Sequence, residues 1–79
     1  NTMTKNIELW DDNKNHIWGV LTDDNTVELT ANDSDIIKGK LQDNKFDLEG
    51  TSNHLWGFLS GDKIELWDDN LHHLSGELT

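Results

Sequence analysis

Four tryptophans and four histidines carry most of the binding chemistry that this chain of 79 residues offers. Trp10 and Trp67 occur in two nearly identical segments, and each lies six residues before a histidine, His16 and His73. An indole ring can stack on another aromatic ring or on a sugar, and tryptophan is the residue type most enriched at binding hot spots. Neighbouring histidine, aspartate and asparagine side chains can hydrogen-bond the hydroxyl groups of a ligand. These residue types therefore indicate binding of a protein or a sugar.

The same side chains form no recognisable metal or catalytic motif. The chain has no cysteine, and no two histidines have the HxH or HxxxH spacing that would place them side by side. Acidic clusters at residues 11–13, 33–35 and 68–70 could hold calcium, but they lack the spacing of a calcium loop. Turn formation explains these clusters better. We expect no catalytic residue, no bound metal and no cofactor.

The elements that position these side chains belong to a repeat of 18–20 residues. Residues 7–22 (IELWDDNKNHIWGVLT) and 64–79 (IELWDDNLHHLSGELT) are identical at most of their sixteen positions, and weaker copies begin at Val27 and Phe46. Within each copy the apolar residues and a glycine recur at every second position, which is the period of a strand. Segments rich in Asp, Asn and Gly between them favour turns. The sequence therefore predicts four tandem β-hairpins, or eight short antiparallel strands.

The spacing also predicts how the strands pair. Within the first hairpin Leu9 should face Ile17, and Ile7 should face Gly19, with equivalent pairs in the other three hairpins. Leu78 and Ile7 are the same kinds of residue that meet at the other junctions, so the sheet can close and remove both edges. These registers predict a shear of eight for eight strands, which describes a narrow barrel filled with side chains. We predict an all-β, closed up-and-down barrel; the alternatives are a two-sheet sandwich and a sheet completed by a second chain.

The predicted barrel determines which side chains face inward. The inward set is Ile7, Leu9, Ile17, Leu21, Val27, Leu29, Ile37, Leu41, Phe46, Leu48, Leu55, Leu59, Ile64, Leu66, Leu74 and Leu78. Four glycines would allow the strands to coil and would give these residues room inside the narrow barrel. The tryptophans have the outward parity, and closure would place Trp56, Trp67, Trp10 and Trp18 in one arc interrupted by Ser75. The candidate binding residues are Trp10, Trp18, Trp56, Trp67, Phe58, His16 and His73.

Several functions are open for such a patch. We favour self-association as a homo-oligomer, because an interface would stabilise a small barrel that has no disulfide. The alternative is a carbohydrate- or protein-binding module of lectin or inhibitor type. The tryptophans could also serve only to stabilise the sheet through cross-strand pairs. An acidic mimic that titrates a basic partner follows from charge alone. A barrel filled with side chains offers no deep pocket, so we predict that the protein is not an enzyme.

Charge and length set further limits. The formal net charge is −10, with sixteen acidic residues, six lysines and no arginine, which opposes nucleic-acid binding. No apolar run approaches the roughly 20 residues of a membrane span, and no signal-peptide pattern follows Met3. We therefore expect no membrane partner and favour a cytoplasmic location. We expect residues 1–6 to be an N-terminal tail, with 1–2 an added remnant, and 7–79 to be one domain of four repeats (7–26, 27–45, 46–63 and 64–79).

Overall fold

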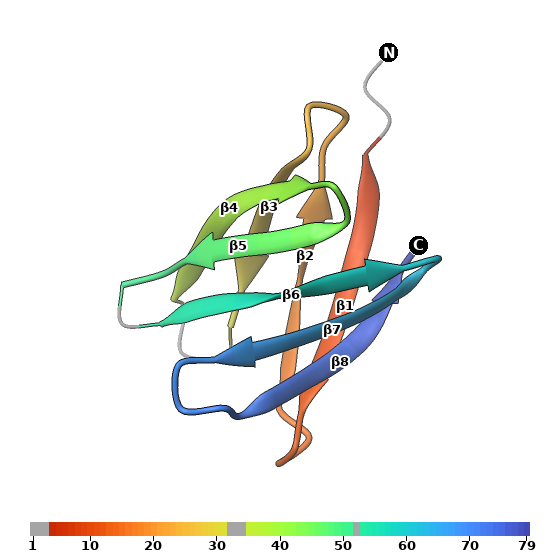
Figure 1. Ribbon diagram of the computed structural model, residues 1–79. Coiled ribbons are helices and arrows are strands. Elements are labelled where there is room, and N and C mark those ends of the chain that lie inside the picture. The colour runs from red at the N-terminus through yellow and green to blue at the C-terminus, as the bar shows by residue number, and fades with distance from the viewer. Residues whose placement is uncertain (1–3, 32–34, 52) are drawn as a thin grey trace.

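The computed structural model describes residues 4–31, 35–51 and 53–79, and within them every regular element is a strand (Figure 1). The strands are β1 (Lys5–Asp11), β2 (His16–Leu21), β3 (Thr26–Thr30), β4 (Ile36–Gln42), β5 (Lys45–Glu49), β6 (His54–Ser60), β7 (Lys63–Asp68) and β8 (His73–Leu78). Each strand pairs with its neighbours in sequence, and β8 pairs with β1, so the sheet is a closed barrel. The predicted all-β fold of four tandem hairpins is confirmed. Among the described residues no helix is long and apolar enough to cross a membrane.

The predicted pairing is confirmed in every hairpin and at every junction. Leu9 faces Ile17 and Ile7 faces Gly19, and the equivalent pairs occur in the other three hairpins. At the seam, Ile7 faces Leu78. A line across the strands runs from Ile7 through Gly19 to Leu29, two residues beyond the equivalent of Ile7 in the second repeat. Four such repeats give the predicted shear of eight, which closes a narrow barrel.

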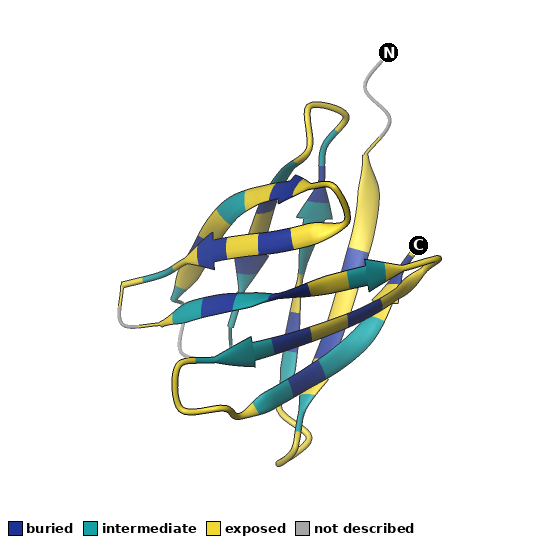
Figure 2. Cartoon of the chain, viewed as in Figure 1, coloured by how far each residue is buried: buried dark blue, intermediate teal, exposed yellow. Residues whose placement is uncertain are grey.

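The interior is an apolar core that side chains from all eight strands fill. Fifteen of the sixteen predicted inward residues are buried, and no described polar residue is buried. Figure 2 shows the resulting alternation of buried and exposed positions along the strands. The exception is Leu59, which is partly buried and packs against the core. Its position next to the β6–β7 turn, at the end of the barrel, explains this difference.

The four glycines of the repeat lie where neighbouring backbones approach closely. A Cβ atom on Gly76 would lie 1.8 Å from the backbone carbonyl oxygen of Glu8, on the neighbouring strand β1. The equivalent glycines Gly19, Gly39 and Gly57 meet the carbonyl of the next strand in the same way. The glycines therefore let the backbones of successive hairpins approach closely.

Acidic side chains form the turns within two of the hairpins. The Oδ1 atom of Asp11 accepts hydrogen bonds from the backbone N–H groups of Asn13 and Asn15, both at 2.9 Å. Asp68 accepts the same two bonds, from Asn70 and His72, in the loop between β7 and β8. These are Asx-type turns, which satisfy backbone donors where the strand ends.

The first strand begins earlier than the predicted repeat. β1 starts at Lys5, which faces Leu21, and the carbonyl of Asn6 accepts a 2.8 Å hydrogen bond from the N–H of Thr79. Two residues of the predicted tail therefore belong to the barrel, and residues 1–3 lie outside the described part of the chain.

Candidate functional site

The first group of predicted binding residues is a stack on the hairpin β1–β2. Trp10 and His16 face each other across the two strands, with ring centroids 5.0 Å apart, and Trp18 stacks on His16 at 5.2 Å. The imidazole therefore lies between two indoles. Trp10 and Trp18 are 43% and 42% exposed, so each still presents indole surface to solvent. We call these three residues the first stack.

The second group is a row across β6, β7 and β8. Trp56 faces Trp67 with ring centroids 5.4 Å apart, and Trp67 faces His73 at 5.2 Å. Phe58 contacts Trp67 edge-on at 6.3 Å and is 48% exposed. Trp56 and Trp67 are partly buried, because rings cover much of their surface. We call Trp56, Trp67 and His73 the second stack.

The two stacks are separated at Ser75, the residue that interrupts the predicted arc. No ring contact among the described residues joins them, because Trp10 faces Ser75 and not an aromatic residue. Eight strands also share one full turn around the barrel axis, so the outer faces of neighbouring strands point about an eighth of a turn apart. The outer faces of β7 and β1 therefore point about a quarter of a turn apart. One flat partner therefore cannot contact both stacks equally.

Each histidine of the stacks lies next to a glutamate that the sequence did not identify as part of the site. The Nε2 atom of His16 is 3.5 Å from the Glu8 carboxylate and has no hydrogen-bond partner in the described structure. His73 Nε2 hydrogen-bonds the equivalent carboxylate, Glu65. The signal was present, because each repeat has an acid as its second residue.

A third pair of this kind lies on β5 and β6. His54 contacts Asp47 at 2.8 Å through Nε2 and Asp69 at 3.1 Å through Nδ1. The hydrogen bond with Asp47, followed by that with Asp69, raises the pKa of His54 above its ordinary value. His54 thus links two hairpins on the outer surface.

Two shallow grooves flank the first stack. One lies between the stacks, has a volume of about 350 Å³, and is lined by Trp10, Lys63, Glu65, Ser75, Gly76 and Glu77. The other, about 310 Å³, is lined by Asn6, Ile7, Glu8, His16, Trp18 and Gly19. We call them the seam groove and the hairpin groove. They meet at the seam, where Glu8 faces Glu77.

The grooves occupy equivalent places on the first and last hairpins. Glu65, Ser75 and Gly76 of the seam groove correspond in the repeat to Glu8, Trp18 and Gly19 of the hairpin groove. The seam groove has serine where the hairpin groove has tryptophan, but it obtains an indole from Trp10 across the seam. Each groove therefore combines one indole with carboxylate groups: Glu8 alone in the hairpin groove, and Glu65 and Glu77 in the seam groove. Both volumes lie at the small end of the usual range for small-molecule sites.

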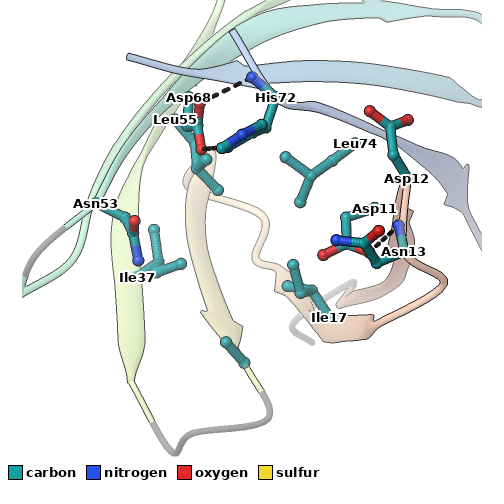
Figure 3. A pocket seen from close by; sticks show the side chains of 11 residues that line it. Asp11, Asp12, Asn13, Ile17, Ile37, Asn53, Leu55, Asp68, His72 and Leu74 are labelled. Atoms are coloured by element: carbon teal, nitrogen blue, oxygen red, sulfur yellow. Dashed lines mark hydrogen bonds and ion pairs between the residues drawn. The ribbon is translucent and has the colours of Figure 1, made fainter. Parts of the chain in front are cut away.

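A third hollow lies at the barrel mouth, beside the loops within the hairpins (Figure 3). Its volume is about 210 Å³; Ile37, Leu55 and Leu74 are among its apolar residues, and Asp11 and Asp68 belong to its polar residues. Burial raises the pKa of both carboxyl groups, but the hydrogen bonds within the two turns outweigh this effect and lower the pKa overall. Because turn formation already uses these carboxylates, the hollow is a weaker candidate than the grooves.

No group of three or more His, Asp or Glu side chains in the described residues is arranged to hold a metal ion. Residues 33 and 34 of the middle acidic cluster lie outside the described part of the chain. Comparisons of the chain with protein-family models, with curated proteins and with solved structures found no match. The functional interpretation therefore rests on the geometry of the grooves.

Proposed function

We propose that this protein is a non-catalytic carbohydrate-binding module whose ligand lies in the seam and hairpin grooves. The observation that carries the proposal is the pairing, in each groove, of an exposed indole with at least one half-exposed carboxylate. A sugar ring has one apolar face of C–H groups and a rim of hydroxyl groups. An indole suits the face, and carboxylate, serine and asparagine oxygens suit the hydroxyl groups.

A sugar fits this surface better than a large apolar partner does. The faces of His16 and Trp67 are already covered by other rings, and the free aromatic surface is divided between two directions. Glu8, Glu65 and Glu77 interrupt it. Charged groups are depleted at the centres of protein interfaces, whereas small polar ligands need such hydrogen-bonding groups.

Self-association is the second candidate function. The sequence favoured it because an interface would stabilise a small barrel that has no disulfide. The closed seam pairs both sheet edges within one chain, so a second copy would have to bind through side chains and not through a sheet edge. The observation that still favours it is a difference between opposite sides of the barrel. Lys38, Lys40 and Lys45 are exposed on β4 and β5, opposite the strands β8 and β1 that carry Glu8 and Glu77. A head-to-tail contact between copies would pair these charges.

The first experiment is a glycan array followed by calorimetric titration of the sugars that bind. Trp10→Ala and Trp18→Ala should each weaken binding by about tenfold, since one lost aromatic contact is worth roughly 1 kcal/mol or more. Ile36→Ala is a matched control, because Ile36 is 49% exposed on a strand remote from the grooves. An array with no bound sugar, or undiminished binding by the Trp10→Ala/Trp18→Ala variant, would refute the proposal.

Sedimentation velocity over a range of concentrations tests the second candidate. A sedimentation coefficient that rises with concentration, and no longer rises in Lys38→Gln/Lys40→Gln/Lys45→Gln, would support self-association through this contact. A single monomer species at every concentration would exclude it.

A further inference from the structure

We infer that the ligand is a chain of amino sugars carrying protonated amines, laid across β7, β8, β1 and β2. This inference rests on the proposed function and specifies the chemical class of the sugar. It follows from the charge of the two grooves, from one unusual carboxylate pair at their junction, and from the direction in which the polar groups run.

The grooves are negatively charged. Three carboxylates line them, against the single ammonium group of Lys63: Glu8 is 54% exposed, Glu65 48% and Glu77 53%. The hydrogen bond from Lys63 to Glu77 lowers the pKa of that glutamate, so it is ionised at neutral pH. A neutral sugar would leave the excess negative charge of the two grooves in place, whereas an ammonium group would neutralise part of it.

The strongest indication is the pair of like charges where the grooves meet. Glu8 and Glu77 face each other directly across the seam, an arrangement that destabilises a sheet. Glu77 has Lys63 as its partner. The side-chain carboxylate of Glu8 makes no hydrogen bond within the described residues, and it lies 3.5 Å from the Nε2 atom of His16. A cation bound between Glu8 and Glu77 would relieve this repulsion, and the free acceptor positions of Glu8 are available to it.

The polar groups form a line that suits a chain and not one sugar unit. Lys63 faces Glu77, Glu77 faces Glu8, and Glu8 faces Trp18 on four successive strands. Neighbouring strands are about 4.8 Å apart, so this line is about 14 Å long. Indoles border the line at Trp10 and at Trp18, and an indole face also attracts ammonium groups.

The test compares two probes with the same sugar backbone, one with free amines that carry charge and one with neutral N-acetyl groups. A glucosamine oligomer and its N-acetylated counterpart of equal length are titrated into the whole protein, at a pH where the free amine is protonated. We expect the glucosamine oligomer to bind at least about tenfold more tightly, which corresponds to one charge-assisted hydrogen bond. Added salt should weaken only this probe markedly.

Matched variants separate the groove from the general acidity of the protein. Glu8→Gln should reduce affinity for the glucosamine oligomer about tenfold and leave the N-acetylated oligomer unaffected. Glu49→Gln removes an equal charge from the exposed surface of β5 and should change neither. Circular dichroism and urea unfolding of each variant establish that it is folded.

Each further outcome has a definite meaning. Equal affinity for both oligomers would overturn the amino-sugar inference and leave the proposed function standing. Failure of both probes, together with an array on which no sugar binds, would overturn both. Equally tight binding of an oligolysine peptide of the same charge, unaffected by Trp18→Ala, would show that bulk charge and not the groove attracts the cation, and it would also overturn the inference.

Discussion

Closure of the barrel at the seam between β8 and β1 depends on Gly76, and substitution of this residue tests both the fold and the site. The ideal Cβ position on Gly76 lies 1.8 Å from the carbonyl oxygen of Glu8, whereas such contacts are essentially never shorter than 3.0 Å. The two backbones must therefore separate by more than 1 Å in Gly76→Ala. Gly76 also lines the seam groove, so this separation would widen the site.

The expected loss of stability follows from this contact. Overpacking of a close-packed site costs about 1–3 kcal/mol, and two weakened backbone hydrogen bonds across the seam add about 1 kcal/mol each. We expect Gly76→Ala to lower the free energy of unfolding by roughly 3–5 kcal/mol. A protein of this size has a total of about 4–12 kcal/mol, so the variant should lie close to the limit of folding.

Urea unfolding followed by tryptophan fluorescence measures the effect. Gly61→Ala is the matched control: Gly61 has a φ of +60°, and its added Cβ meets no atom within 4 Å. Only the left-handed backbone is then penalised, by roughly 1–2 kcal/mol. If Gly76→Ala destabilises the protein no more than Gly61→Ala does, the close approach of the two strands is not what limits closure, and our explanation of the glycines is wrong.

Three further predictions concern the outer surface. Trp67→Ala should lower the free energy of unfolding more than Trp18→Ala, by about 1–2 kcal/mol in urea unfolding, because Trp67 contacts three aromatic or imidazole rings and Trp18 contacts one. The raised pKa of His54 means that its pairing with Asp47 stabilises the protein fully below the ordinary value of 6.5 and is lost as pH rises through the raised pKa. Between about pH 6 and pH 8 the Tm should therefore fall more steeply for the natural protein than for Asp47→Asn, and parallel curves would contradict this. Leu71→Asn should raise the free energy of unfolding by up to about 1 kcal/mol, since Leu71 has a φ of 62° and is 70% exposed; a decrease would contradict the backbone explanation.

The barrel could be predicted from the sequence because three independent signals agree. The period of two determines the inward face, the glycine opposite Ile7 sets the register of the first hairpin, and the match between Leu78 and Ile7 predicts closure. A shift by one residue would have placed Trp10 inside and Leu9 outside, so the register is strongly specified. Leu59 differs because the pattern does not indicate where the barrel ends and solvent begins.

The site was less predictable, because parity indicates only that a side chain points outward. It does not reveal that Trp10 stacks on His16 and turns away from Trp67, since this depends on rotamers and on the curvature of the barrel. The grooves are likewise products of the tertiary fold. Glu8 and Glu77 are 69 residues apart in the chain and face each other only because the seam is closed.

Closure also explains why the proposed binding surface lies where it does. The two most similar repeats are the first and the last, and the seam makes them neighbours, so their glutamate, tryptophan and histidine positions lie side by side. They differ at two outward positions that matter for the surface: the first has Trp18 and Val20, and the last has Ser75 and Glu77. Ser75 faces Trp10 across the seam, and an indole at this position would fill the space that the seam groove now occupies. A backbone that repeats regularly thus places the groups of the proposed binding surface, and the small side chain of Ser75 leaves the space of the seam groove between them.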